Sequence, residues 1–149
     1  MRLRTLLRLR PRDHFLLLEA TTLLALARLA VLLLPFRVIS RRLGEEMAES
    51  PPDDDPRHGE TLRRVTWALA AVSRRTPWRS KCLEQGIAGK MMLRARGIPS
   101  TLYMGVARLP GEGIEGHAWL RSGSRYVSGG AIRERFVVVS TFADGTAHR

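Results

Sequence analysis

The chain has 149 residues, 44% of them hydrophobic, so it is long and apolar enough for one folded domain and is not disordered as a whole. Its single cysteine excludes an internal disulfide and a zinc site built on cysteines, and it fits a reducing compartment. The net charge of +11, mostly from arginine, indicates an acidic peptide, a partner protein, nucleic acid or an anionic membrane surface, unless it only reflects arginine-rich codon usage. Nucleic acid ranks low, because the aromatic residues do not alternate with the basic ones.

The N-terminal third of the chain predicts helices. A leucine-rich helix is expected from Pro11 to Leu34, stopped by Pro35, with Asp13 as a candidate N-cap. A second, short helix is expected over 36–43, before Gly44.

The leucine-rich helix follows an arginine-rich head and could be mistaken for a signal peptide or a membrane anchor. Glu19 and Arg28 interrupt it, and no small-residue cleavage site follows. Because a charge near the middle of a bilayer is costly, we do not expect the helix to span a membrane. We expect the rest of the domain or a partner to cover its apolar face, and peripheral membrane contact remains open.

An acidic, proline-bearing stretch, residues 45–56, reads as an exposed linker. We therefore divide the chain into a helical arm with its linker, 1–56, and a core, 57–149. Asp55 and Pro56 predict a helix N-cap with proline at the first helical position. The helix should run to about Arg75, with one face in the core, made of Leu62, Val65, Leu69 and Val72.

The next predicted helix, 82–96, follows a loop over 78–81 and begins at the only cysteine, Cys82. Unpaired backbone N–H groups and the helix dipole favour a thiolate at this position. Gly86 and Gly89 weaken the helix, and close packing of a sheet against them would compensate. Glu84 and Gln85 follow on the same helix, and we expect both side chains to be exposed to solvent.

The remainder of the chain predicts strands, with a hairpin turn at 122–124. The expected strands are Thr101–Ala107, Gly116–Arg121, Arg125–Ser128 and Phe136–Phe142. Helices followed by antiparallel strands predict an α+β domain.

Cys82 and His117 form the candidate catalytic pair. A thiol at a helix start and an imidazole on a later strand are the arrangement of papain-like and transglutaminase-like cysteine enzymes. The imidazole could take the thiol proton and then protonate a leaving amine. A lone cysteine is also commonly a small buried hydrophobic residue, and a strand histidine is commonly structural.

Four short segments resemble the lasso-peptide maturation protease, the leader peptidase of the transglutaminase-like superfamily. They are SKCLEQ at 80–85, LRARGI at 93–98, MGV at 104–106 and GHAWL at 116–120. The resemblance covers residues 78–142 and implies a papain- or transglutaminase-like core, with an N-terminal helix that also looks like the family.

The resemblance implies a bacterial, cytoplasmic cysteine peptidase that removes the leader from a ribosomally made precursor peptide. It makes Cys82 the nucleophile and His117 the general base and acid, and it implies no cofactor and no metal. On the geometry of such sites, the Cys82 N–H would be an oxyanion donor. Because the first 60 residues read as helical, no leader-binding domain is expected. A separate leader-binding protein and an ATP-dependent cyclase are the implied partners.

The third catalytic residue of the family is missing. The family has an Asp about a dozen residues after the histidine, whereas residues 124–130 here contain no acid. Ser128 or Gly129 should face His117 across the hairpin, so Ser128 is one candidate to orient the imidazole. Asp144 is the other candidate, and Glu115 could also reach it if a loop folds back. A Cys–His dyad or an impaired enzyme stays open.

Two other functions stay open. The missing acid favours a non-catalytic binding module of the same fold. A transglutaminase or another acyl-transfer enzyme of the superfamily would use the same thiol.

Overall fold

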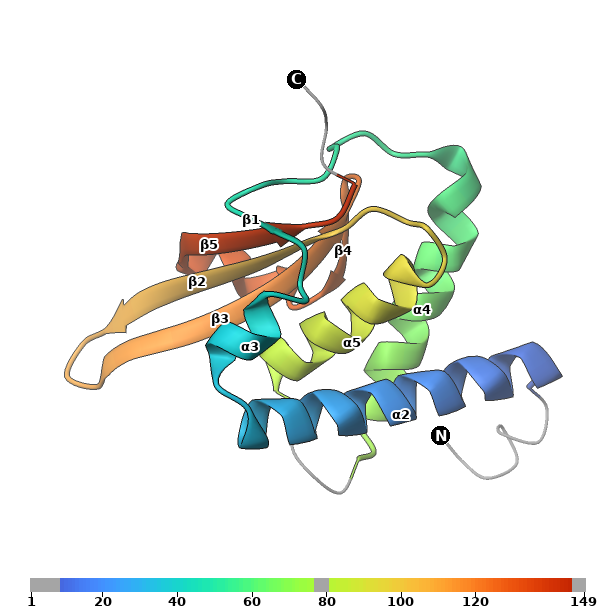
Figure 1. Ribbon diagram of the computed structural model, residues 1–149, viewed down its shortest axis with the longest axis horizontal. Helices are drawn as coiled ribbons and strands as arrows, with labels where there is room; N and C mark the ends of the chain where they lie inside the picture. The colour runs from blue at the N-terminus through green and yellow to red at the C-terminus, as the bar shows by residue number, and fades with distance from the viewer. Residues whose placement is uncertain (1–8, 77–80, 146–149) are drawn as a thin grey trace.

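The computed structural model describes residues 9–76 and 81–145 (Figure 1). The helices are α2 (Pro11–Leu33), α3 (Phe36–Ser40), α4 (Gly59–Ser73) and α5 (Cys82–Arg94), with the 3₁₀ helices η1 (Pro56–His58) and η2 (Gly130–Arg135). The strands are β1 (Glu45–Glu46), β2 (Thr101–Leu109), β3 (Gly113–Ser122), β4 (Arg125–Ser128) and β5 (Val137–Ala143). The predicted α+β class is confirmed, and the predicted loop before Cys82 lies outside the described residues except for Lys81.

The strands form one antiparallel sheet in the order β1-β5-β2-β3-β4. Strand β1 pairs with β5. Further along, Ser50 is buried, and its N–H donates to the Thr101 Oγ1 on β2 at 2.8 Å. The expectation of an exposed linker over 45–56 is wrong for Glu45–Glu46, which form the edge strand of the sheet, and for the buried Ser50, while both glutamates are exposed as expected. The division of the chain at residue 56 stays a prediction.

Helix α5 lies between the sheet and α2, with α4 beside it (Figure 1). Its two glycines allow this close packing. A Cβ on Gly89 would come within 2.8 Å of Leu120 on β3 and within 2.9 Å of Leu69 on α4, and a Cβ on Gly86 would strike Leu102 on β2. The predicted compensation for two helix-weakening glycines is confirmed, since the sheet occupies the space of the missing methyl groups.

Helix starts follow the predictions in one of two cases. Asp55 caps η1, which leads into α4, and its Oδ1 accepts the Arg57 N–H at 2.9 Å. The hydrogen bonds from Arg57 lower the pKa of Asp55 to about 2. Asp13 does not cap α2: the N-cap is Arg10, and Asp13 instead pairs with Arg64 of α4 at 3.0 Å. The core-facing stripe predicted for α4 is confirmed, with Leu62, Val65, Leu69 and Val72 all buried.

A buried lysine in the third turn of α5 links this helix to the sheet. Lys90 is fully buried, and its Nζ donates to the Ser100 and Phe142 carbonyls at 2.9 and 3.1 Å. It also pairs with Asp144 at 3.0 Å, and Arg94 pairs with the same carboxylate from the solvent side at 2.8 Å. Burial lowers the pKa of Lys90, and Asp144 opposes this shift.

Lys90→Met should lower the free energy of unfolding by about 3 kcal/mol, because it leaves two carbonyls and a carboxylate without their buried partner. The matched variant Arg94→Met removes a more exposed cation from the same carboxylate and should cost about 1 kcal/mol. Denaturant unfolding of both variants measures the difference. Equal losses would show that burial of Lys90 does not set the strength of this contact.

Candidate functional site

Cys82 and His117 line one open cleft of about 630 Å³. The cleft lies where the start of α5 meets β3, β4 and η2. Its other lining residues are Gln85, Tyr126, Val127, Ser128, Gly129, Gly130, Ala131, Ile132 and Arg133. The structure thus brings together the two residues that the sequence singled out from segments 35 positions apart.

The thiol lies at the first residue of α5, as predicted. Cys82 is half-buried, and the Gln85 N–H closes the first turn of the helix on the Lys81 carbonyl at 3.1 Å. The N–H groups of the first turn precede the intrahelical ladder, so they lie free of the helix's own hydrogen bonds. The positive end of the helix dipole therefore points at Cys82.

Glu84 is not exposed, contrary to the prediction. Its side chain is buried, with Oε2 accepting the Lys81 N–H at 3.1 Å and Oε1 pairing with Arg28 of α2 at 2.9 Å. Gln85 is half-buried and lines the cleft. The Arg28 guanidinium therefore neutralises the one carboxylate that lies within the first turn below the thiol.

His117 is held from two sides. Its Nε2 lies 2.7 Å from the Gly129 carbonyl oxygen. Its ring centroid lies 4.9 Å from that of Phe136 and 5.8 Å from that of Trp119. Trp119 is buried and stacks in turn on Tyr103 with 5.5 Å between centroids. The imidazole is thus fixed by one hydrogen bond and by aromatic walls.

The Gly129 carbonyl determines which ring nitrogen of His117 can act as a base. A carbonyl oxygen only accepts hydrogen bonds, so Nε2 carries the proton in the neutral ring. Nδ1 is then the unprotonated nitrogen and the one able to take a proton. A backbone carbonyl thus holds the imidazole here, whereas a carboxylate holds the catalytic imidazole in many cysteine and serine enzymes.

The thiol and the imidazole share the cleft without a hydrogen bond between them. Alternation along β3 directs Ala118 and Leu120 into the core beneath α5, while His117 follows Trp119 on the other face. His117 and Cys82 are therefore related through the cleft that both residues line, and not through a direct contact. In enzymes without substrate, catalytic hydrogen bonds are often long and tighten when substrate binds.

The two candidates for a third residue do not contact His117. The Ser128 hydroxyl is buried and has no hydrogen-bond partner among the residues that the structure describes. Asp144 is committed to Lys90 and Arg94 near the Ser100 end of β2, roughly 15 Å along the strands from His117 at 3.3 Å per residue. Glu115 faces Arg135 at 3.9 Å. The group that contacts the His117 ring is instead a main-chain atom, Gly129 O. The sequence predicts that Ser128 or Gly129 faces His117 across the hairpin, but it does not predict this hydrogen bond.

Gly129 has a left-handed backbone, with φ +68°. This conformation favours glycine, and a Cβ here would come within 3.1 Å of the Trp119 Cβ. The double glycine after β4 is the sequence signal for a main-chain approach at this position.

A model of the transglutaminase-like superfamily matches residues 30–141, so the chain belongs to this superfamily. The superfamily includes cysteine proteases and transglutaminases. The matched region contains α5, the whole sheet as far as Thr141, and every residue that lines the cleft. No curated protein and no solved structure matches the chain.

Arg28→Gln should slow alkylation of Cys82 at neutral pH, because an unneutralised Glu84 carboxylate two residues away repels the negative charge that a sulfur nucleophile needs. It should also lower the free energy of unfolding by about 2 kcal/mol, since it leaves a buried carboxylate unpaired. Iodoacetamide kinetics and denaturant unfolding measure the two effects.

Arg96→Gln is the matched control. It breaks the ion pair between α2 and the turn after α5, Arg96 with Glu19 at 2.6 Å, which is partly exposed. It should cost about 1 kcal/mol at most and leave the alkylation rate unchanged. An equal slowing in both variants would mean that the pair at Arg28 acts only through overall stability.

Proposed function

We propose that this chain is a cysteine peptidase that removes the leader from a ribosomally made lasso precursor peptide. The observation that carries the proposal is the shared cleft of Cys82, at the start of α5, and His117, whose Nε2 is held by Gly129 O. The motifs that resemble the leader peptidase at 80–85 and 116–120 supply these two cleft residues.

The reaction follows from the two groups. Nδ1 of His117 takes the Cys82 proton, and Sγ attacks the carbonyl carbon of the last leader residue. The Cys82 N–H is available to the oxyanion. The imidazolium then protonates the leaving amine, which becomes the N-terminus of the core peptide. His117 next activates water, which hydrolyses the thioester and frees the leader as a carboxylate and the thiol as the resting group.

The charge of the cleft fits a neutral or acidic peptide. Of its lining residues, all in the described part of the chain, Arg133 alone carries a formal charge. Its guanidinium lies over the Tyr126 ring at 4.2 Å and donates to Gly130 O at 2.9 Å. The same guanidinium pairs with Glu134, whose side chain is exposed, at 3.4 Å, and a peptide carboxylate that displaced Glu134 would gain a charge-assisted hydrogen bond.

The proposed partners follow the proposed reaction. The precursor's leader region is the substrate, a separate leader-binding protein delivers it, and an ATP-dependent cyclase uses the freed amine. The proposed location is the bacterial cytoplasm, where a free catalytic thiol stays reduced.

A second candidate function is a non-catalytic binding module. Two observations favour it: Cys82 and His117 share no hydrogen bond, and the imidazole is oriented by a neutral carbonyl rather than by an acid. An acyl-transfer enzyme is the third candidate, and its product would join an amine to the leader instead of adding water.

Cleavage of a candidate precursor, followed by mass spectrometry in the presence of the leader-binding protein, separates the three. The wild type should release a leader whose mass includes one added water, and Cys82→Ala should release none because no other thiol exists. Ser80→Ala, beside the nucleophile in sequence, is the control for expression and handling.

Three results would contradict the peptidase proposal. Equal cleavage by the wild type and Cys82→Ala would remove Cys82 as the nucleophile. A leader joined to an amine would indicate acyl transfer. Tight leader binding without cleavage would support the binding module.

A further inference from the structure

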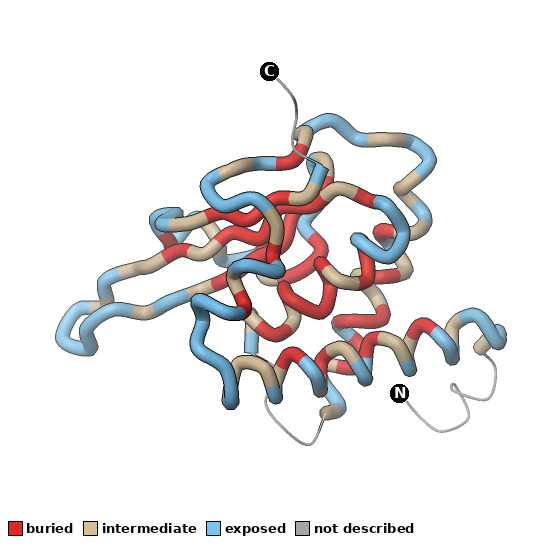
Figure 2. Tube along the Cα trace, in the orientation of Figure 1, coloured by how far each residue is buried: buried red, intermediate tan, exposed pale blue. Residues whose placement is uncertain are grey.

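The outward face of α2 is uncharged and mostly apolar, interrupted by the exposed Thr21 and Thr22, whose hydroxyls donate to the Leu17 and Leu18 carbonyls of the helix itself. Six of its side chains are between 51% and 74% exposed: Phe15, Leu18, Leu26, Leu29, Leu32 and Leu33. The opposite face is buried against α4 and α5 through Leu16, Ala20, Leu24 and Ala27 (Figure 2). At 1.5 Å per residue, this outer stripe extends for about 28 Å.

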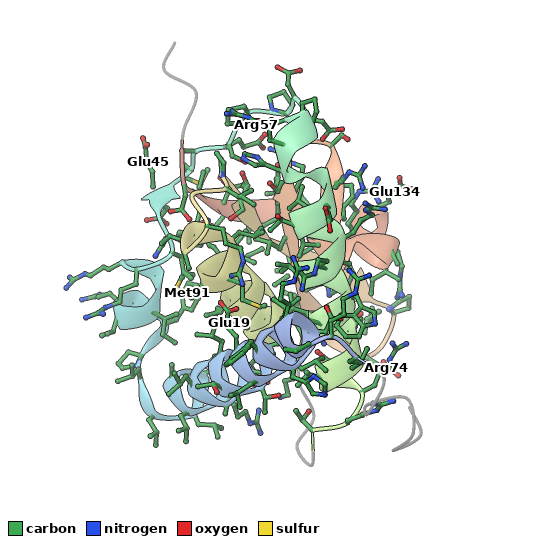
Figure 3. The ribbon with its side chains drawn as sticks, turned by 90° about the vertical axis from the view of Figure 1, so that its right-hand side faces the viewer. Glu19, Glu45, Arg57, Arg74, Met91 and Glu134 are labelled. Carbon is green, nitrogen blue, oxygen red and sulfur yellow. The ribbon has the colours of Figure 1, made fainter. Side chains whose placement is uncertain are left out.

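No charge interrupts this outer stripe. The sequence has two charged residues between Phe15 and Phe36, Glu19 and Arg28. Both turn inward and are neutralised by α5 or the turn after it: Glu19 by Arg96 at 2.6 Å and Arg28 by Glu84 at 2.9 Å (Figure 3 shows Glu19 between the two helices). The two charges that argue against a membrane span in the sequence are therefore absent from the outer stripe.

Arginines flank the stripe at both ends. Arg10 and Arg12 are exposed at the start of α2, and Arg37, Arg41 and Arg42 are exposed on and after α3. An exposed apolar stripe flanked by cations is the pattern of helices that lie in the interface of an anionic bilayer. Each arginine near such a surface adds to the attraction.

The helix can lie on a membrane but cannot cross one without unfolding its own domain. By length and composition alone α2 could span a bilayer. Spanning would strip its inner face from the core and expose two ion pairs to lipid, Glu19 with Arg96 and Arg28 with Glu84. Lying flat keeps both pairs and buries only side chains that water now contacts.

We propose that the outer face of α2, with the arginines at its two ends, docks this protein on an anionic lipid surface. The helix lies parallel to the bilayer, its leucines enter the acyl boundary, and the arginines bind lipid phosphates. This docking does not depend on the proposed peptidase activity, because it uses none of the residues of the cleft.

Co-sedimentation with vesicles tests the proposal. The probes are vesicles of phosphatidylglycerol and phosphatidylcholine in equal parts, and vesicles of phosphatidylcholine alone. The wild type should bind the anionic vesicles at least about tenfold more tightly, and added salt should weaken the binding. Leu26→Glu with Leu29→Glu should lose binding about tenfold or more, because it places two carboxylates on the docking face.

Val137→Glu with Val139→Glu is the matched control, since these β5 side chains are also exposed, 71% and 54%, but lie on the sheet. Thermal unfolding checks that each variant folds, and the control should bind like the wild type. Absent binding by the wild type, or equal loss in both variants, would overturn the proposal. A third result would also overturn it: the wild type binds no vesicles, and the α2 variant alone loses self-association or binding to the leader-binding protein. The outer face of α2 would then be covered by a protein.

Discussion

The hydrogen bond between His117 Nε2 and the Gly129 carbonyl is the contact on which the chemistry of this cleft depends. At 2.7 Å it sets the tautomer, and with it the nitrogen that can take a proton. It requires a left-handed backbone at Gly129 and a β4 that ends just before it, so that η2 can fold back over β3. The aromatic contacts of Phe136 and Trp119 then leave the ring little freedom to rotate away.

The position of the thiol depends on a different set of contacts, those of α5. Close packing at Gly86 and Gly89 brings this helix onto the sheet, and Lys90 fastens its middle to the strand ends. Helix α2 completes the arrangement, because Arg28 neutralises the carboxylate of Glu84 beside the thiol. The same inward turn of Arg28 leaves the outer face of α2 uncharged, so one ion pair serves both the cleft and the proposed docking surface.

Features of the fold that depend on residues near one another in the sequence were predicted correctly. The α+β class, the strands, the helix start at Cys82 and the strand position of His117 all follow from periodicity, caps and turn residues. The errors concern partners distant in sequence. The residues next to Glu84 in the sequence give no sign that Arg28, 56 positions earlier, pairs with it, so the sequence predicts an exposed side chain. The strand at 45–46 is missed for the same reason, because its partner β5 lies almost a hundred residues later.

The Gly129 carbonyl that contacts His117 could not be predicted from side-chain patterns, for another reason. The orienting group is a carbonyl, which every residue carries, so no letter in the sequence marks it. Searching for an acid led instead to Asp144, which the fold uses to neutralise Lys90 and Arg94. The informative signal was the double glycine after β4, a place where main chain can approach a ring closely.

The most direct test of this account is nitrogen-15 NMR of the His117 ring in the folded protein, assigned by comparison with His117→Gln. The account predicts a neutral ring protonated on Nε2, with that proton slow to exchange because Gly129 O accepts it. A ring protonated on Nδ1, or one that exchanges freely between the two forms, would contradict it, because the nitrogen assigned as the base would then already hold a proton or lack a fixed orientation.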